Sequence, residues 1–412
     1  MISQPLTLNS ETSSTASMRI CIVSVGSPKN IGGLASYMRF LSQNLSKNCE
    51  VSVTSRFTRH DAAKDNYSGY QEPEVIDNGS YKINVISYHP LWRPILRRLI
   101  SLVCRPYLQQ IALRLYGGAY RKSLSRTIPQ QVDVVHFVGV GWELLGFLAL
   151  AEARKRGAAF TILPAVHPGT WGDDSLDIAF YNQADAVFVL SESERTHLIK
   201  LGVEAPRLHV SGLAPASDVT GDATRFRQKH GLGERPLILF VGRKDRGKGF
   251  HALREAMPQI LAAIPDACLV TVGPDREPPY PDVPETALLD LGLASEADKI
   301  DALAACDVFC LPSEQESFGI VYVEAWAYGK PVVGGPAPAV RDLITEGVNG
   351  YCVTQNKEEI ADTLIRLLRD PVLRRELGEN GRRLQQSRYA WEAVTQDHQE
   401  VFRQAVSAKT AA

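Results

Sequence analysis

Short runs of apolar and β-branched residues alternate with amphipathic stretches from Met18 onward, as strands alternate with helices in α/β proteins. In the first half of the chain, helical periodicity covers residues 34–44 and 143–156, and strands are expected at 19–25, 51–55, 83–88, 133–138, 160–163, 186–190 and 208–211. Such alternation is typical of a parallel sheet covered by helices. The first half is therefore expected to form one doubly wound, Rossmann-like unit.

The same alternation resumes after residues 214–222, which are small and polar and predict a domain boundary. Strands are expected at 236–241, 268–272, 287–290, 308–311 and 331–334, with a helix whose apolar positions recur at three and four residues after Phe250. The expected fold class is α/β with two Rossmann-like parallel-sheet domains, residues 18–215 and 216–388, after a disordered leader, residues 1–17.

Composition limits the classes of function. The 412 residues include 45 Lys and Arg against 46 Asp and Glu, so a net charge of -1 gives no overall attraction to nucleic acid. No apolar run approaches the roughly 18 residues of a membrane-spanning helix, and the Ser/Thr-rich start does not resemble a signal peptide. We expect a cytoplasmic protein whose membrane contacts, if any, are peripheral.

The seven cysteines are scattered and mostly lie in apolar segments, where a thiol behaves as a small core residue. This usage favours a reducing compartment. Cys306 and Cys310 form the one close pair in the sequence, but no His or further Cys stands near them at zinc-site spacing. We therefore expect no metal site and no bound metal cofactor.

The stretch from Pro312 to Val333 is the most informative part of the chain. It follows the strand expected at 308–311, and residues 320–326 read as a short helix that Gly329 and Pro331 end. At the helix entrance, Ser317, Phe318 and Gly319 would offer free backbone N–H groups to a phosphate or a sugar hydroxyl. Glu316 precedes the entrance.

Glu324 lies among apolar residues of that helix, where a carboxylate is costly unless it has a partner. It could accept hydrogen bonds from a diol such as a ribose. After the first strand of the second half, Arg243 and Lys248 stand beside Gly242. Cations at the carboxyl end of a parallel strand are well placed for a diphosphate, whereas the intervening charges, Lys244 to Arg246, are read as solvated loop charges.

This constellation resembles the retaining glycosyltransferases of the GT-B fold, family four, whose signature is two glutamates eight positions apart. Glu316 and Glu324 have that spacing, with Ser-Phe-Gly between them, and Gly242, Arg243 and Lys248 match the family's Gly-Arg and Lys-Gly elements. The resemblance runs from Met18 through most of the chain. It implies two domains facing a cleft, with residues 389–407 as a helix crossing back to the first.

The resemblance also implies a reaction and site roles. A sugar would pass from a nucleotide diphosphate sugar, UDP- or GDP-linked, to an acceptor hydroxyl with retention of configuration and without a metal. The first domain would bind the acceptor and the second the donor. Arg243 and Lys248 would stabilise the leaving diphosphate, and Glu324 would hold the ribose. Glu316 and the segment Ser317, Phe318, Gly319, Ile320 and Val321 would hold the rest of the donor.

In the first half, Gly32 and Gly33 match the family's loop near the donor phosphates, and His167 matches its histidine near the sugar and the acceptor. Taken alone, a glycine pair is most often a turn and a lone histidine is most often structural. The chain also departs from the family: Pro168 replaces an acidic or amide residue, and Asp342 follows Pro338-Ala339 where a glycine pair and Glu are common. Asp173 and Asp174 are equally well read as loop charges.

Residues 91–128 carry eight basic residues among apolar and aromatic ones and no Asp or Glu. A basic amphipathic helix is the natural reading, suited to an anionic membrane surface or a lipid-linked acceptor. The alternative is a helix packed on its own domain with its arginines in water. A glycan or lipid-linked acceptor of cell-envelope or exopolysaccharide synthesis is expected.

Two other functions remain open at this point. A sugar-nucleotide epimerase could use the same architecture without an acceptor, and a non-catalytic subunit could bind sugar nucleotides without turnover. The intact set of Arg243, Lys248, Glu316 and Glu324 disfavours the second.

Overall fold

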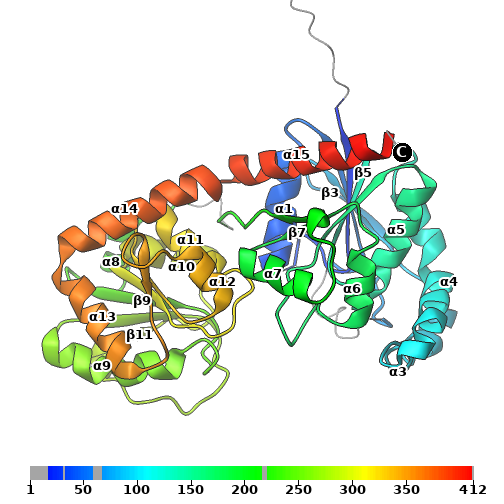
Figure 1. The fold of residues 1–412 in the computed structure, drawn as a ribbon. Helices are drawn as coiled ribbons and strands as arrows, with labels where there is room; N and C mark the ends of the chain where they lie inside the picture. The colour runs from blue at the N-terminus through cyan, green and yellow to red at the C-terminus, as the bar shows by residue number, and fades with distance from the viewer. Residues whose placement is uncertain (1–16, 31–32, 59–66, 216–219, 411–412) are drawn as a thin grey trace, which may run out of the picture.

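The computed structural model describes residues 17–30, 33–58, 67–215 and 220–410. In this part of the chain, two mainly parallel sheets form separate halves that lie side by side (Figure 1). The expected α/β fold class is confirmed. Most of the predicted leader, residues 1–16, and the middle of the predicted boundary, residues 216–219, lie outside the described residues, so both stay predictions.

The first sheet has eight strands in the order β3-β4-β2-β1-β5-β6-β7-β8. Their bounds are β1 Arg19–Ser24, β2 Glu50–Ser55, β3 Glu74–Asp77, β4 Lys82–Val85, β5 Val134–Val138, β6 Ala159–Leu163, β7 Ala186–Val189 and β8 Leu208–Val210. Sequence patterning missed β3, which runs antiparallel at the edge. Its residues are half-buried or exposed, so it carries no apolar run.

The helices of the first half cover both faces of this sheet. They are α1 Gly33–Leu45, α2 Arg93–Leu96, α3 Leu99–Val103, α4 Gln109–Thr127, α5 Leu145–Lys155, α6 Ser175–Tyr181 and α7 Glu192–Lys200. Because side chains alternate along a strand, Ile20 and Ile22 pack in the core shared with α1, whereas Cys21 and Val23 pack in the core shared with α4 and α5.

Residues 91–128 form three helices, so the prediction of a single basic amphipathic helix was wrong. Instead, the 3-10 segment Pro90–Trp92 leads into α2, a two-residue turn separates α2 from α3, and the 3-10 segment Pro106–Leu108 lies between α3 and α4. Both 3-10 segments and α2 have a proline in the first turn, where proline is accepted although it is not in a helix interior, so the prolines explain where these elements begin.

The second sheet has six strands in the order β11-β10-β9-β12-β13-β14, all parallel, which is the doubly wound arrangement. Their bounds are β9 Leu237–Val241, β10 Cys268–Val272, β11 Leu288–Asp290, β12 Val308–Leu311, β13 Val332–Gly334 and β14 Gly350–Cys352. The short edge strand β14 was missed: it begins at a glycine, holds no β-branched residue and is only half-buried at its other two positions.

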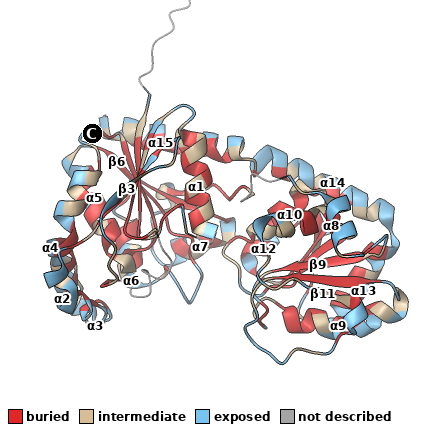
Figure 2. Ribbon diagram, turned by 180° about the vertical axis from the view of Figure 1, so that it is seen from behind, coloured by how far each residue is buried: buried red, intermediate tan, exposed pale blue. Residues whose placement is uncertain are grey.

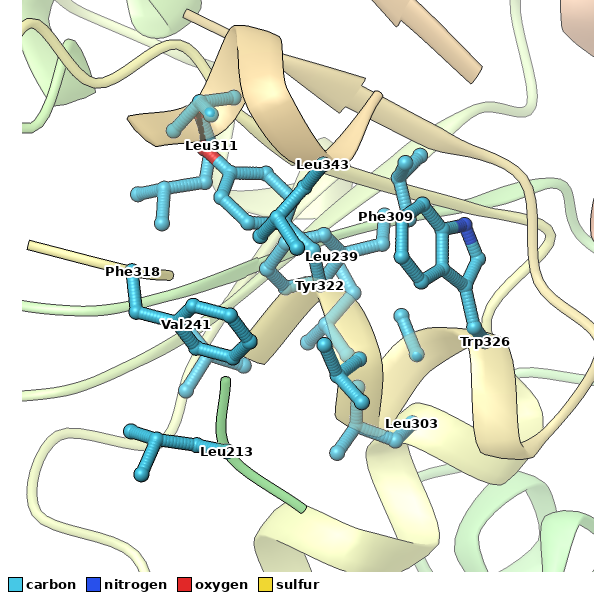
Figure 3. Close-up of a cluster of buried hydrophobic side chains, with 14 of the residues drawn as sticks. Leu213, Leu239, Val241, Leu303, Phe309, Leu311, Phe318, Tyr322, Trp326 and Leu343 are labelled. Atoms are coloured by element: carbon cyan, nitrogen blue, oxygen red, sulfur yellow. Dashed lines mark hydrogen bonds between the residues drawn. The ribbon is translucent and has the colours of Figure 1, made fainter. Parts of the chain in front are cut away.

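The helices of the second half are α8 Ala223–Lys229, α9 Phe250–Ala263, α10 Glu296–Ala305, α11 Ile320–Ala327, α12 Pro338–Leu343, α13 Lys357–Arg369 and α14 Pro371–Arg388. The central strands are buried and the outer helix faces are exposed (Figure 2). Figure 3 shows how α11 is held: Tyr322 donates its hydroxyl to Leu311 O at 2.6 Å, and Trp326 points into the same apolar cluster.

The last helix, α15 Trp391–Thr410, continues from α14 and packs on α1 and β6 of the first half (Figure 1). Trp391 stacks on Phe40 with ring centroids 5.4 Å apart. Deeper in, the Tyr37 hydroxyl contacts His398 Nε2 at 2.8 Å and His136 Nε2 at 3.2 Å. The end of the chain therefore ties the second half to the first.

Candidate active site in the cleft between the halves

The site begins at the point where the order of the second sheet reverses, between β9 and β12. The loops that follow these strands touch: Glu314 N donates to Gly247 O at 2.9 Å. Gly249 has a φ of +73°, and a Cβ there would lie 2.4 Å from Pro312 O. Glycine is therefore needed for the two loops to approach, at the crevice where doubly wound sheets bind ligands.

This contact brings together two residues that the sequence placed in separate motifs. Lys248 Nζ binds Glu316 Oε1 at 2.6 Å and Gln315 O at 2.8 Å. Both side chains are mostly buried, with 16% and 13% exposed. An ammonium held beside a carboxylate in this way is a fixed point charge, directed by its partner rather than free in solvent.

Arg243 lies on the same loop with its side chain 56% exposed, and its Nε contacts Asp245 Oδ2 at 3.0 Å. The prediction that Lys244 and Asp245 are solvated loop charges was wrong, because both residues are buried. Lys244 is fully buried and binds both carboxylate oxygens of Asp290, at 2.5 and 2.6 Å. A buried lysine needs such a partner, so this pair ties the end of β9 to the end of β11.

At the entrance of α11, Gly319 has a φ of +86°, which glycine adopts without strain. Ser317 lines the cavity described below, whereas Phe318 turns inward and packs its ring 5.6 Å from that of Tyr389. Ile320 and Val321 are half-buried in the first helical turn. Of these predicted donor residues, Ser317 thus lines the cavity, whereas Phe318 packs in the apolar cluster drawn in Figure 3.

Glu324 is buried on α11. Its carboxylate oxygens accept hydrogen bonds from Lys299 Nζ of α10 at 3.2 and 3.3 Å, so the buried carboxylate has the partner that it needs. Burial alone would lower the pKa of Lys299, but Glu324 and Glu296 outweigh it and raise that pKa. Sequence reasoning singled out the glutamate and missed the lysine. The one available signal was the need of a buried carboxylate for a cation.

On the opposite wall, His167 opens a tight turn after β6. Thr170 N donates to His167 O at 3.0 Å, with Pro168 second and Gly169 third in the turn, at a φ of +75°. Proline and then a positive-φ glycine are what a type II turn requires. Pro168, which departs from the family pattern, therefore shapes the loop that carries the histidine.

Helix α7 braces this loop at two points. Asp173 accepts hydrogen bonds from Gly169 N at 2.6 Å and His197 Nε2 at 3.0 Å, so it is not a free loop charge, whereas Asp174 is the N-cap residue of α6. Glu194 is buried and accepts from Val166 N at 2.8 Å and Leu190 N at 2.7 Å. Burial raises the pKa of Glu194 to about 7.

A cavity of about 630 Å³ lies between the halves, lined by His167, Ser193 and Glu194 from the first and by Glu316, Ser317 and Asp342 from the second, among others. Asp342 Oδ2 accepts a hydrogen bond from Ser193 N at 2.6 Å across it. Asp342, which stands where the family commonly has Glu, thus makes a contact between the halves.

Charged side chains of the second half act electrostatically on His167 of the first half. The pKa of His167 is lowered, first because surrounding protein displaces its hydration, and further because Lys248 and Arg243 repel its charged form. The nearby Glu316 opposes that shift. His167, Lys248, Glu316 and Arg243 therefore lie close enough to influence one another electrostatically.

Other predicted site residues lie around this centre. Gly33 is the exposed first residue of α1, and Gly32 lies outside the described residues. Gly273 packs closely against Gly242: a Cβ on Gly273 would lie 1.9 Å from Gly242 O. Within the described ranges, no three His, Cys, Asp or Glu side chains gather as metal ligands, and no helix is long and apolar enough to cross a membrane.

Comparison with known proteins agrees with this geometry. Residues 222–384 match the family described as glycosyl transferases group 1. A GDP-mannose-dependent monoacylated alpha-(1-6)-phosphatidylinositol monomannoside mannosyltransferase of Corynebacterium glutamicum is 28% identical over 92% of this chain and 96% of its own. A phosphatidyl-myo-inositol mannosyltransferase of Mycobacterium tuberculosis is 34% identical over 40% of this chain and 46% of its own.

Solved structures share the fold at lower identity. Sucrose-phosphate synthase from Thermosynechococcus elongatus superposes with a TM-score of 0.69 at 21% identity, over 95% of this chain and all of its own. Anabaena HepE in complex with UDP and glucose gives 0.70 at 17%, over 94% of this chain and all of its own. With two Rossmann-like halves around a cleft, this chain has the GT-B fold of glycosyltransferases, and its residues 222–384 match the group 1 glycosyl transferase family.

Proposed function

We propose that this glycosyltransferase moves a sugar from a nucleotide diphosphate sugar to an acceptor hydroxyl with retention of configuration and without a metal. The observation that carries the proposal is the arrangement of Lys248, Glu316 and Arg243 at the reversal point of the second sheet, facing His167 across the cleft. Fixed cations at that crevice suit a departing diphosphate, whose charge they stabilise as it develops.

The other residues take their roles around that centre. Glu316 and the backbone from Ser317 to Ile320 hold the sugar, and Val321 completes the donor wall. Glu324 accepts hydrogen bonds from the ribose, with Lys299 as the ion-pair partner of its carboxylate. His167 contacts the sugar or the acceptor. The departing phosphate takes the acceptor's proton on the same face, so no side-chain base is required.

The donor and acceptor are proposed from the relatives. The names of both mannosyltransferases specify phosphatidylinositol-type substrates, and that of the Corynebacterium protein also specifies GDP-mannose. We infer a GDP-linked hexose as donor and a polyol or glycan headgroup on a lipid anchor as acceptor. The enzyme would then work at the inner face of the membrane, with residues 18–215 as acceptor domain and 216–388 as donor domain.

Residues 91–128 are proposed to contact that membrane. Five large apolar side chains are exposed within a short stretch of this segment: Leu91, Ile95, Ile100, Tyr107 and Ile111. Arg93, Arg97 and Arg98 are exposed among them. Apolar side chains that enter the lipid boundary, surrounded by arginines that reach anionic headgroups, are the features of an interfacial contact.

The test of the catalytic assignment is turnover. Arg243→Ala and Lys248→Ala should each lower turnover by about a hundredfold, because a charge contact in the transition state contributes about 3 kcal/mol. Arg246→Ala is the matched control, since this arginine is exposed on the same loop. Near-normal activity of both cleft variants would exclude the assignment.

The identity of the donor and the stereochemistry of transfer can be tested in separate experiments. GDP-mannose should raise the melting temperature of the purified protein more than UDP-glucose does at the same concentration, because a ligand at concentration c stabilises the folded state by RT ln(1 + c/Kd), so the tighter ligand stabilises more. Proton NMR of the product should show the anomeric configuration of the donor. An inverted product, or donor turnover without an acceptor product, would refute retaining transfer.

The membrane contact is tested by vesicle flotation. Leu91→Ser with Tyr107→Ser should weaken binding to anionic vesicles severalfold, because each exposed apolar side chain adds burial in the interface. Val372→Ser is the control, an equally exposed apolar residue on α14. Unchanged flotation of the double variant would refute the contact.

A further inference from the structure

A second hollow, of about 600 Å³, lies on the first half between α4 and α5. Five cations line it: Arg114, Arg121, Lys122 and Arg126 from α4, and Lys155 from α5. All five are exposed, and none of them makes a hydrogen bond or ion pair within the described part of the chain. Like charges gathered without counter-charge repel one another, so such a hollow favours an anion.

The one carboxylate in the lining does not neutralise them. Glu152 is buried, and Arg156 engages it in an ion pair whose two side chains are almost fully covered. Arg156 also donates to Ser125 O at 2.8 Å, which fixes α5 against α4 beneath the hollow. The lining therefore offers the five cations no carboxylate that is not already paired with Arg156.

We propose that this hollow is a binding site for a phosphate-bearing anion, distinct from the catalytic cleft. Three of its cations are arginines, whose planar forks match phosphate oxygens in pairs, and the volume exceeds that of one phosphate, leaving room for an attached headgroup. None of its lining residues lines the catalytic cavity, and α4 lies at the end of the first half remote from the second (Figures 1 and 2).

The source of the anion is the phosphate of an anionic lipid headgroup, or a soluble phosphate ester. The lipid is favoured by the surroundings. Gly118 lines the hollow, and Trp92 rests on it so closely that a Cβ there would lie 2.5 Å from the indole ring. Trp92 neighbours the exposed Leu91, so the hollow adjoins the apolar edge proposed above to contact membrane. Only this choice of source rests on the proposed function.

The test uses the full chain and the double variant Arg121→Gln with Lys122→Gln. Its matched control is Arg375→Gln with Arg383→Gln, which removes two exposed cations from α14. The probes are glycerol 3-phosphate in solution, vesicles of phosphatidylcholine, and the same vesicles with phosphatidylglycerol. The hollow variant should bind the phosphate probe about tenfold or more weakly than wild type and control.

The outcomes separate the sources. Variant-sensitive binding of phosphatidylglycerol vesicles alone identifies a lipid phosphate, and variant-sensitive binding of glycerol 3-phosphate as well identifies a site for phosphate of either source. Equal binding by variant and control, or stronger variant-sensitive binding of single-stranded RNA, overturns the proposal. Nucleotide sugar should stabilise the hollow variant as much as it stabilises wild type. If nucleotide sugar does not stabilise wild type, the proposed function is refuted, but the proposed anion site in the hollow is not.

Discussion

Glu324 illustrates how one residue constrains its surroundings. A carboxylate that is 2% exposed needs a cation, and the fold supplies Lys299 from the neighbouring helix α10. The need was visible in the sequence because apolar residues flank Glu324. The identity of the partner was not, since α10 and α11 approach each other only in the folded chain.

Lys299→Met should therefore lower the free energy of unfolding by about 3 kcal/mol, because the buried carboxylate loses its ammonium partner. Urea unfolding measures this loss. Lys299→Arg, which keeps the charge, should be close to wild type, and adding Glu324→Gln to Lys299→Met should restore part of the stability. If the double variant is no more stable than Lys299→Met, the pair is not the cause.

At the scale of elements, the loops after β9 and β12 form one structure because Gly249 permits their contact. Gly249→Ala forces a side chain into positive φ and against Pro312 O, so it should cost about 2 kcal/mol or more and separate Lys248 from Glu316. We expect both melting temperature and turnover to fall. Gly247→Ala is the control, because its Cβ would meet only Asp245 Oδ1, at 3.5 Å.

Helix α15 docks through buried, uncharged histidine. Burial lowers the pKa of His398 to about 4, although its bond to Val394 O opposes the shift. The unfolded chain binds this proton near pH 6.5 and the folded chain only near 4, so stability is complete above 6.5 and falls as the pH drops through that window.

His398→Gln should remove this contribution. Between pH 6.5 and 5, wild type should lose about 2 kcal/mol more unfolding free energy than the variant, measured by urea titration at the two pH values. His136, whose pKa is lowered by burial and further by the neighbouring His398, stays in both proteins, so the difference between them reports His398 together with its effect on His136. Equal pH dependence in both proteins would show that His398 is not the titrating group.

At the scale of the whole molecule, the two halves meet in the cleft through the bond from Ser193 N to Asp342 Oδ2. Ser193 is in the first turn of α7, where backbone N–H groups lack helical partners and favour an anion. Asp342→Ala should loosen the halves, with a larger radius of gyration in X-ray scattering and a several-fold higher KM for the donor. Asp342→Asn, which keeps an acceptor, should change less; identical scattering and KM in all three proteins would contradict this role.

The sequence by itself determined the two-sheet architecture and named the candidate residues of the site. Each predicted strand has its counterpart, because apolar runs and their alternation report burial directly. Among the strands of the described residues, the polar edge strand β3 and the short strand β14 were missed, as were the breaks within residues 91–128. The two glutamates, Arg243, Lys248 and His167 could be proposed as site residues because a motif and the end of a strand are local properties of the sequence.

Tertiary structure alone decided which of these residues meet. Lys248 and Glu316 are far apart in the chain and become neighbours through the order of strands β9 and β12. Lys299, Glu194 and Lys155 carry no local signature, and the four cations of α4 stand out in the sequence only as basic residues of 91–128, because the role of each depends on what faces it. Burial and charge pairing are properties of contacts between elements, and contacts between elements exist only once the chain has folded.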